Sequence, residues 1–290
     1  MPELPEVQTT VNGLQAKVRN RTFVDVWSDW SKMVKEPGSF KDFKKLLKGR
    51  KILRLWRRAK NVVFELSGGY SLLVHMKMTG HLLHGTWSMK HETWVASEDG
   101  ALQDKINGYL HMIFFLDDGR MIALSDMRKF AKVELQETED LLMIFEGLGP
   151  EPLEKNFTFE KFAALFAGRR GKVKQVIMAP EFIAGIGNIY ASEALWEAKM
   201  HPLKDVSTLS KKELLLLYKA IRKVLALGVE FGGDSFSDYR DVDGKKGKFE
   251  GEKKVYQREN QKCFRCKTLI KRLKIGQRSS FYCPQCQKIS

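Results

Sequence analysis

All four cysteines of this 290-residue chain lie near its C-terminus, as two pairs. The pairs are Cys263-x2-Cys266 and Cys283-x2-Cys286, and residues 267–282 separate them. This spacing is typical of a zinc site in which two tight turns bring four thiolates to one tetrahedral ion. Two disulfides are disfavoured in an intracellular chain, and the spacing argues against four unrelated thiols. A segment this short can hardly fold without metal, so the sequence predicts one structural Zn2+ in a C-terminal module.

Two short apolar runs inside this module predict a β-hairpin. Thr268-Leu269-Ile270 and Phe281-Tyr282 lie on either side of Gly276, which suits a turn. The module is also basic, so its hairpin is a candidate phosphate contact, although such charges more often form a solvated face. The basic residues are Lys271, Arg272, Lys274 and Arg278.

The charge balance of the chain points to a polyanionic partner. Lys and Arg number 50 against 35 Asp and Glu, which gives a net charge of +15 and an isoelectric point near 9.6. Because the excess is spread along the chain, it indicates a basic surface on folded domains, and it favours nucleic acid over an acidic membrane. No apolar run is long enough to cross a bilayer, and the N-terminus lacks the apolar core of a signal peptide. We therefore expect a soluble intracellular protein.

The N-terminus carries a candidate nucleophile. Pro2 follows Met1, and a small second residue normally leads to removal of the initiator methionine. A terminal α-amino group has an ordinary pKa of about 8, against about 10.4 for lysine, so part of it is neutral at physiological pH. A neutral amine attacks an electrophilic carbon to form an iminium, and Glu3 places a carboxylate beside it. Taken alone, the commoner explanation is that Pro2 and Pro5 lead into a helix.

The apolar pattern divides the chain into a helix, a strand-rich part and a helical part. A stripe with steps of three and four opens the chain, at Leu4, Val7, Val11, Leu14 and Val18. Residues 21–135 then read as strands, with a strong hairpin signal at Asp117-Asp118-Gly119. Residues 85–108 are polar and irregular, and we expect a long loop there. After Gly149-Pro150 the pattern is helical, and Ser210 with Glu213 predicts a capping box that opens a longer helix.

Two glycine-rich segments are candidate ligand contacts. Gly185-Ile186-Gly187-Asn188 precedes a predicted helix, where glycines expose backbone N–H groups to a phosphate, although a packing turn is commoner. Residues 232–248 are glycine-rich, charged and too long for a simple connection, which predicts a functional or disordered loop.

Several of these segments together resemble bacterial formamidopyrimidine-DNA glycosylase, a repair family that removes oxidised purines. Each motif is short, but their joint occurrence in this order is highly specific and covers essentially the whole chain. The matching segments are Pro2-Glu3-Leu4-Pro5-Glu6-Val7, Arg57-Arg58-Ala59-Lys60, His75-Met76-Lys77-Met78-Thr79-Gly80, Asp126-Met127-Arg128-Lys129-Phe130, Leu148-Gly149-Pro150-Glu151-Pro152-Leu153, Gly185-Ile186-Gly187-Asn188-Ile189-Tyr190-Ala191-Ser192-Glu193, Gly232-Gly233, the cysteine quartet and Gln277-Arg278-Ser279-Ser280-Phe281-Tyr282-Cys283.

The resemblance implies an α+β fold with three domains. An N-terminal helix on a two-layer β-sandwich would form a catalytic domain over residues 1–137. A helical helix–two-turn–helix domain would occupy residues 138–254 and carry a lesion-recognition loop, residues 232–248, which we call the lesion loop. A C-terminal β-hairpin zinc finger would occupy residues 255–290. The partner would be damaged double-stranded DNA in a basic cleft between the two halves, and the protein would be a cytoplasmic, nucleoid-associated monomer of bacterial type.

The resemblance also assigns the chemistry. Pro2 would attack C1′ of the damaged nucleotide, expel the base and form a Schiff base, while Glu3 moves protons. Lys60 would assist β-elimination and grip phosphate. Arg278 would assist δ-elimination and clamp the flanking phosphate, because a fork of donors suits a phosphate. For Lys60 and Arg278 taken singly, the alternative is solvated surface charge.

Further matching residues would contact DNA. Met78, Arg128 and Phe130 match a triad that fills the space left by the flipped base, where Phe130 wedges a base step and Arg128 bonds the widowed cytosine. Without the motif, core packing would be the better explanation for Met78 and Phe130. Lys174 and Asn188 match phosphate contacts of the helical part, and Arg169 falls at a basic DNA-contact position nearby.

Four positions depart from the family pattern. Tyr109 stands where a DNA-contacting His is common, so that contact is in doubt. Met127 replaces a common Pro, Lys77 a common Gly and Gln8 a common Glu. The segment 85–108 is longer than usual and has no assigned role.

The leading hypothesis is a DNA glycosylase and abasic-site lyase for 8-oxoguanine and ring-opened purines, with strand cleavage by β,δ-elimination. An enzyme of the endonuclease VIII type, specific for oxidised pyrimidines, is disfavoured because Leu4 and the lesion loop fit the purine enzyme. A non-catalytic zinc-finger DNA-binding protein would explain the charge and the cysteines, but not Pro2, Glu3 and Lys60.

Overall fold

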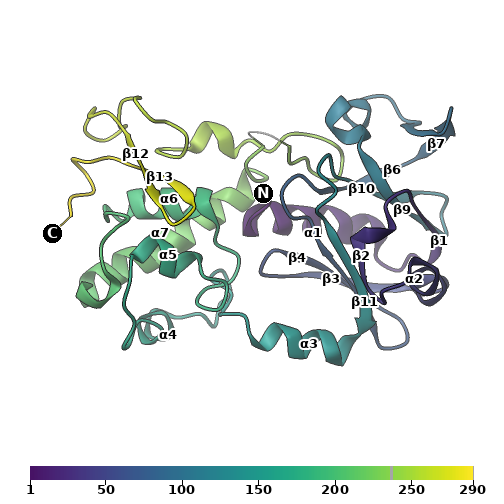
Figure 1. The fold of residues 1–290 in the computed structure, drawn as a ribbon, viewed down its shortest axis with the longest axis horizontal. Helices are drawn as coiled ribbons and strands as arrows, with labels where there is room; N and C mark the ends of the chain where they lie inside the picture. Colours follow the sequence, from purple (N-terminus) through teal and green to yellow (C-terminus); the bar gives the residue numbers. More distant parts are fainter. Residues whose placement is uncertain (236–237, 290) are drawn as a thin grey trace. The chain divides into compact units, whose positions relative to one another are not determined.

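The computed structural model describes residues 1–235 and 238–289, so two residues of the lesion loop and the last residue lie outside the description. The chain divides into two compact units, which are considered separately (Figure 1). Unit 1 joins Met1–Glu146 to Phe231–Glu250, and unit 2 joins Gly147–Glu230 to Gly251–Ser290. The lesion loop therefore belongs to the same unit as the N-terminus.

Unit 1 is built on two β-sheets. The four-stranded sheet has the order β1 (Phe23–Ser28), β9 (Leu110–Leu116), β10 (Met121–Ser125) and β6 (His81–Gly85). The five-stranded sheet has the order β2 (Val34–Glu36), β11 (Lys132–Glu137), β5 (Tyr70–His75), β4 (Asn61–Leu66) and β3 (Ile52–Arg58). Neighbouring strands are antiparallel except β2 and β11, which run parallel. The predicted hairpin around Asp117-Asp118-Gly119 is confirmed as the β9–β10 turn.

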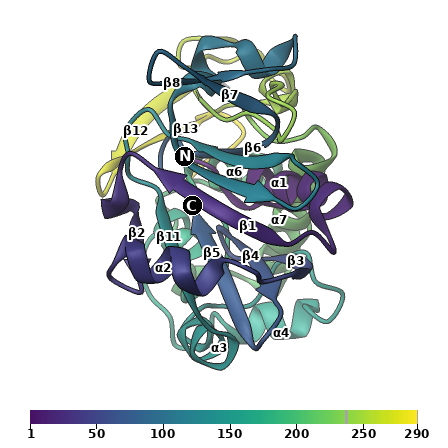
Figure 2. The same ribbon diagram turned by 90° about the vertical axis from the view of Figure 1, so that its right-hand side faces the viewer.

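The two sheets enclose one hydrophobic core, which confirms the predicted two-layer sandwich (Figure 2). Phe23 of β1 has its ring centroid 5.7 Å from that of Phe114 in β9 and 6.3 Å from that of Phe64 in β4. Aromatic side chains bury large apolar areas, so these contacts hold the layers together. The preceding residue of β9, Ile113, points to the other face because side chains alternate along a strand, and it is also fully buried.

The helix predicted at the N-terminus is confirmed as α1 (Leu4–Val18), and its apolar stripe is buried along its whole length. It packs against β3, β4 and β6. Unit 1 has two further helices, α2 (Phe40–Leu47) and α3 (Thr138–Glu146). The helix α2 falls within residues 21–135, where only strands were predicted. Ser39 caps α2 by accepting a hydrogen bond from the N–H of Asp42 at 3.4 Å.

The prediction of a long loop over residues 85–108 is wrong. The segment forms a hairpin of β7 (Trp87–Lys90) and β8 (Thr93–Ala96), seen near β6 in Figure 2, followed by two 3-10 turns, η2 (Ala101–Gln103) and η3 (Lys105–Gly108). It covers the outer face of the four-stranded sheet with its own small core, which includes Trp87, Leu102 and Ile113. The hairpin turn at His91 and Glu92 has positive φ without the glycine or asparagine that usually marks such a turn, which explains the error.

Unit 2 is helical and ends in a small hairpin. Its elements are α4 (Phe159–Ala164), α5 (Val173–Met178), α6 (Asn188–Glu197), α7 (Lys211–Glu230), β12 (Lys271–Ile275) and β13 (Arg278–Tyr282). The remaining 3-10 turns of the chain are η1 (Ser31–Met33), η4 (Val206–Thr208) and η5 (Phe249–Glu252). Within the described residues, no helix combines the length and apolar character that a membrane span requires.

The predicted capping box is confirmed at the start of α7. The N–H of Ser210 donates to the Glu213 carboxylate at 3.0 Å, and the N–H of Glu213 donates to Ser210 Oγ at 3.3 Å. The zinc-module hairpin is also confirmed, but its first strand begins at Lys271, after the predicted run of residues 268–270.

We expect His81 to make the stability of the protein pH-dependent. Complete burial lowers its pKa from 6.5 to about 4, and this outweighs the opposite effect of its hydrogen bond with Asn107. As the pH falls from 6.5 towards 4, the unfolded chain binds a proton here that the folded chain does not bind. The stability present above pH 6.5 is therefore lost, by up to about 3 kcal/mol for this group.

Denaturant unfolding of the wild type and of His81→Gln, at neutral pH and near pH 4, measures this contribution. The loss of stability on acidification should be smaller in the variant. An equal loss in both proteins would contradict the assignment to His81.

Candidate functional site

The N-terminal end of α1 holds the two predicted catalytic residues. Pro2 and Glu3 are both buried, and Glu3 is the N-cap residue of the helix. A capping box joins Glu3 to Glu6: the N–H of Glu6 donates to the Glu3 carboxylate, and the N–H of Glu3 donates to Glu6 Oε2 at 2.8 Å. A helix N-terminus favours negative charge because its peptide dipoles and free N–H groups face that end. The fold therefore fixes an acidic side chain directly beside Pro2.

Glu6 is a residue that the sequence reasoning did not single out, and it links the N-terminus to the lesion loop. Its second carboxylate oxygen, Oε1, accepts a hydrogen bond from the N–H of Asp234 at 2.7 Å. Its carbonyl oxygen accepts a hydrogen bond from the Tyr239 hydroxyl at 2.9 Å. Gly233 has φ +83°, and a Cβ there would lie 2.8 Å from Glu6 Oε1, so glycine is required. The spacing of Glu3 and Glu6, typical of a capping box, was the available sequence signal.

Met78, Arg128 and Phe130 lie on two turns of unit 1. Met78 lies between β5 and β6, and the other two lie between β10 and β11. Met78 is 41% exposed and Phe130 is 50% exposed, so core packing does not explain them. The guanidinium carbon of Arg128 lies 4.6 Å from the ring centroid of Phe130, within range of a cation–π contact. Exposed apolar side chains on turns suit insertion between bases.

Asp126 ties these two turns together. Its carboxylate is completely buried and accepts a hydrogen bond from the Thr79 hydroxyl, next to Met78. The same carboxylate accepts from the N–H of Ala131 at 2.7 Å and from the N–H of Arg128 at 3.3 Å. Because a buried carboxylate without partners is costly, this set of donors fixes the turns relative to each other.

A surface hollow of about 370 Å³ lies between the N-terminal Met1 and two members of this triad, Met78 and Phe130. Lysines predominate in its lining, so the hollow favours an anion. Lys32 and Lys129 both lie against the ring of Trp30, with their ammonium groups 5.2 Å and 4.8 Å from the ring centroid. The lining residues are Met1, Lys32, Lys35, Lys77, Met78, Lys129, Phe130, Ala131 and Lys132.

Lys60 lies in the two-residue turn between β3 and β4. Burial, followed by the positive charges of Lys77 and Lys60, lowers the pKa of His75 to about 4. His75 is therefore neutral at physiological pH, and its Nδ1 accepts a hydrogen bond from the N–H of Lys77 at 3.0 Å. The turn thus presents the Lys60 ammonium near a neutral imidazole.

Three of the departures from the family pattern keep a local structural role. Lys77 has φ +56°, the left-handed conformation in which a glycine is least strained. The carbonyl oxygen of Tyr109 accepts a hydrogen bond from the N–H of Asp126 at 2.8 Å, so this residue supports the turn that carries Arg128. Gln8 accepts a hydrogen bond from Arg57 Nε at 2.9 Å. Met127 is exposed, and nothing in the structure explains its replacement of proline.

In unit 2, the predicted phosphate-contacting residues gather at the carbonyl oxygen of Ser279. Asn188 Nδ2 donates to this oxygen at 3.0 Å, and Lys174 Nζ lies 3.4 Å from it and 2.9 Å from Ser192 Oγ. Lys174 is buried, whereas Arg278 is exposed, and both line a hollow of about 210 Å³. Asn188 is the first residue of α6, after Gly187, so backbone N–H groups face the same region.

Arg169 lies apart from this group in the described structure. It is exposed in the turn after α4, and its guanidinium carbon lies 5.6 Å from the ring centroid of Phe182. Arg169 and the adjacent Arg170 line a second hollow of unit 2, of about 480 Å³.

The four cysteines fit the predicted zinc site. Their sulfur atoms all lie within 4.8 Å of one another, and none forms a disulfide. Cys263 Sγ is 4.0 Å from Cys286 Sγ, and Cys266 Sγ is 3.4 Å from the sulfur atoms of Cys283 and Cys286. Zinc–sulfur bonds of about 2.3 Å in a tetrahedron place sulfur atoms about 3.8 Å apart. The chain therefore carries a site for one structural zinc.

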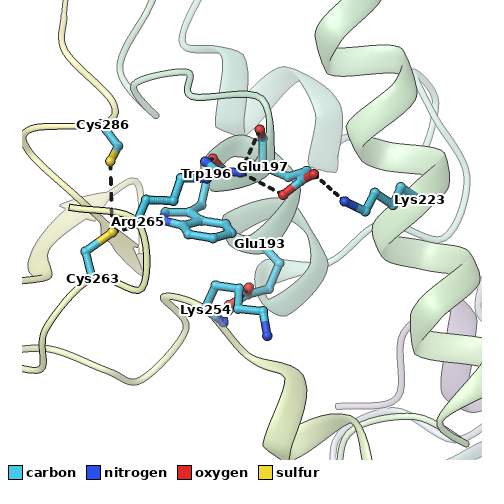
Figure 3. Close-up of polar contacts among 8 residues, drawn as sticks. All are labelled: Glu193, Trp196, Glu197, Lys223, Lys254, Cys263, Arg265 and Cys286. Atoms are coloured by element: carbon cyan, nitrogen blue, oxygen red, sulfur yellow. Dashed lines mark hydrogen bonds and ion pairs between the residues drawn. The ribbon is translucent and has the colours of Figure 1, made fainter. Parts of the chain in front are cut away.

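Residues of α6 support the metal site from outside (Figure 3). Trp196 Nε1 donates to Cys263 Sγ at 3.5 Å, the kind of outer contact that orients a metal ligand. The guanidinium of Arg265 stacks on Trp196, with its carbon atom 3.6 Å from the ring centroid, and donates to Glu197 Oε2 at 2.8 Å. Lys223 of α7 reaches the other oxygen of Glu197 at 2.6 Å.

Glu193 joins the same helix to the segment that leads into the zinc module (Figure 3). It is almost fully buried, and its carboxylate accepts from the N–H groups of Lys254, Val255 and Tyr256 at 2.8, 3.0 and 2.8 Å. Burial raises the pKa of Glu193, and the three N–H donors oppose this effect. The segment that leads into the zinc module is therefore anchored to α6 by buried hydrogen bonds.

We expect the zinc module to depend on its metal. Purified protein should contain one zinc per chain by atomic emission, and Cys266→Ser should lose it to a chelator far faster than the wild type. Removal of the metal should unfold the module and weaken DNA binding. Lys274→Ala, which changes an exposed hairpin residue that is not a ligand, is the control and should retain zinc. Full DNA binding by metal-free protein would contradict the structural role.

Three models of known protein domains together match most of the sequence. Residues 1–133 match the formamidopyrimidine-DNA glycosylase N-terminal domain, and residues 148–240 match the formamidopyrimidine-DNA glycosylase H2TH domain. Residues 260–289 match a zinc finger found in FPG and IleRS. The cysteine quartet and the Met78, Arg128 and Phe130 turns lie within these matches.

Full-length relatives agree with the domain matches. A formamidopyrimidine-DNA glycosylase from Chloroflexus aggregans is 38% identical over 99% of this chain and 98% of its own length. That from Pelotomaculum thermopropionicum is 38% identical over 100% of both chains. Among solved structures, a Lactococcus lactis FPG mutant bound to Fapy-dG-containing DNA has a TM-score of 0.86 and 30% identity, covering 99% of this chain and 100% of that chain. MutM in complex with DNA containing carbocyclic 8-oxo-G has a TM-score of 0.85 with the same identity and coverage. From its domains, full-length relatives and fold, this chain belongs to the formamidopyrimidine-DNA glycosylase family.

Proposed function

We propose that this protein is a base-excision repair enzyme, a DNA glycosylase and abasic-site lyase that removes oxidised purines from double-stranded DNA. The observation that carries the proposal is the lysine-lined hollow of unit 1. Met1, which precedes Pro2, lines it together with Met78 and Phe130. Removal of Met1 would free the Pro2 nitrogen beside this hollow, where a flipped nucleotide would meet the groups that replace its base. The relatives are glycosylases of this kind by name.

The chemistry would begin at Pro2. Its neutral amine attacks C1′ as the glycosidic bond breaks, and the base leaves with the bonding electrons and takes up a proton. Opening of the sugar then gives an iminium between Pro2 and C1′. Glu3 is the carboxyl group in position to give and take protons, because the capping box with Glu6 holds it beside Pro2.

Strand cleavage would follow by β- and δ-elimination. We assign Lys60 to the β-elimination step and to phosphate binding, since its turn presents an ammonium group near the neutral His75. We assign Arg278 to δ-elimination and to the flanking phosphate, because an exposed guanidinium on a rigid hairpin offers a fork of donors. Each leaving phosphate is an anion, and a nearby cation stabilises it.

The exposed triad would hold the DNA open. Phe130 would wedge a base step, Met78 would fill the space of the flipped base, and Arg128 would bond the opposite cytosine. In unit 2, the DNA phosphate backbone would be bound by Arg169, Lys174 and Asn188. Tyr109 would contact DNA in place of the histidine that is common in the family. Lys174 is buried, so we propose that it has two effects: it fixes the polypeptide backbone at Ser279, and its positive charge attracts phosphate.

The chain would be organised in three functional domains. We propose functional domains at residues 1–137, 138–254 and 255–290, with the lesion loop at residues 232–248. The enzyme would act as a monomer in the cytoplasm of a bacterial cell, associated with the nucleoid. Light scattering of the purified protein tests whether it is a monomer.

Borohydride trapping tests the catalytic proposal. Incubation with duplex DNA that contains 8-oxoguanine opposite cytosine, with borohydride present, should give a covalent adduct at Pro2, because borohydride reduces the iminium. Without borohydride, the strand should be cleaved with loss of the terminal sugar fragment. An N-terminal tag that prevents exposure of Pro2 should abolish both results and leave DNA binding intact. The same tag at the C-terminus is the control.

The outcomes of this experiment separate the alternatives. Trapping on an oxidised pyrimidine in preference to 8-oxoguanine would favour an endonuclease VIII type of enzyme. Binding to DNA without adduct or cleavage on any lesion would favour a non-catalytic DNA-binding protein and overturn the proposal.

Truncation of Met78 tests the role of the triad. Met78→Ala should lower the rate of 8-oxoguanine excision by at least about tenfold, because nothing then fills the space of the flipped base. Its thermal stability should stay near that of the wild type, since Met78 is exposed. The matched control is Met89→Ala, which truncates a methionine of similar exposure in the β7–β8 hairpin. Equal effects of the two substitutions would rule out a specific role for Met78.

A further inference from the structure

The segment 86–108 has no role in the proposed chemistry, yet it touches the lesion loop through one buried residue. Asn107, in the 3-10 turn η3, is completely buried. Its Nδ2 donates to the carbonyl oxygen of Gly244 at 3.1 Å and to that of Ala101 at 2.6 Å. Its Oδ1 lies 2.9 Å from His81 Nε2. A single amide therefore connects β6, the segment 86–108 and the lesion loop.

The surroundings of Asn107 allow only one orientation of its amide. The carbonyl oxygens of Gly244 and Ala101 only accept hydrogen bonds, so the NH2 group must face them. The amide oxygen then accepts from the protonated Nε2 of a neutral His81. Because Asn107 and His81 are buried and the bond to Gly244 is buried as well, water cannot readily replace a lost partner there. The amide thus has a specific function at this position that a carboxylate or a methyl group lacks.

The loop side of this contact is equally constrained. Gly244 has φ +79°, and a Cβ there would lie 2.6 Å from Asn107 Nδ2 and 3.0 Å from the Ala101 backbone. Nearby, Val242 is part of the main core, and its carbonyl oxygen accepts from the N–H of His84 at 2.8 Å. The returning limb of the lesion loop, residues 239–247, is therefore held by both β6 and the segment 86–108.

We propose that Asn107 is a positioning residue for base excision, which ties the returning limb of the lesion loop to the segment 86–108. This rests on the proposed function, in which the lesion loop recognises the oxidised purine. Asn107 itself touches neither DNA nor the reacting atoms in this role. The segment 86–108 then supports the loop, because its hairpin and small core hold η3 against the four-stranded sheet.

The proposal separates the two activities of the enzyme. Excision requires the loop to hold a base, whereas an abasic site offers no base for the loop to contact. Loss of the Asn107 contact should therefore slow excision of 8-oxoguanine and leave cleavage at a preformed abasic site nearly unchanged. A merely structural role would lower both activities together.

Asn107→Asp is the sharpest variant, because it preserves shape and replaces the NH2 donor by an oxygen that faces two carbonyl oxygens. We expect single-turnover excision of 8-oxoguanine to fall about tenfold, and abasic-site cleavage to stay within about twofold of the wild type. Hydrogen–deuterium exchange should accelerate at residues 240–247 in the variant. The matched control is Gln103→Glu, which makes the same amide-to-carboxylate change at an exposed residue of the same segment and should alter none of these readouts.

Gly244→Ala disrupts the same contact from the side of the loop. It keeps the proposal testable if Asn107→Asp fails to fold. It should also lower excision more than abasic-site cleavage, and its effect should not add to that of Asn107→Asp, since both remove one contact. Equal losses of the two activities, or unchanged excision in both variants, would overturn the proposal. Absence of excision by the wild type would instead contradict the proposed function itself.

Discussion

The buried carboxylate of Glu6 is the contact on which the arrangement of unit 1 depends. One oxygen accepts from the N–H of Glu3, beside the candidate nucleophile, and the other accepts from the N–H of Asp234, 228 positions away in the chain. Burial makes both hydrogen bonds hard to replace by water. The group that would perform the chemistry and the loop that would select the base are therefore built around one side chain.

A buried polar side chain also fixes the backbone at three other places. Asp126 fixes the turns that carry Met78 and Arg128, and Glu193 holds the segment before the zinc module. Asn107 holds the returning limb of the lesion loop. Turns and loops cannot satisfy their N–H and carbonyl groups within a helix or a sheet, so a buried side chain must do so. Positional accuracy at the site thus comes from polar groups, while the apolar core supplies the platform beneath them.

Features that repeat or pair locally could be predicted from the sequence. The spacing of Cys263 to Cys286 indicated the metal site, and the stripe of α1 is buried as its periodicity indicates. The prediction of a loop over residues 85–108 was wrong for two reasons. The turn residues His91 and Glu92 carry no ordinary turn signal, and Trp87 is buried only by contact with another part of the fold. The short helix α2 was missed for a similar reason, since its apolar face covers only two turns.

The sequence by itself determined the chemistry that the chain carries: a terminal secondary amine with a neighbouring carboxyl group, a basic composition, four metal ligands and a set of short motifs. Only the tertiary structure decided that Met78 and Phe130 are exposed and line the same hollow as Met1. It also decided that Glu6 and Asn107 contact the lesion loop. The reason is that exposure and long-range hydrogen bonds depend on which distant segments of the chain meet. Local periodicity of apolar residues does not show which segments these are.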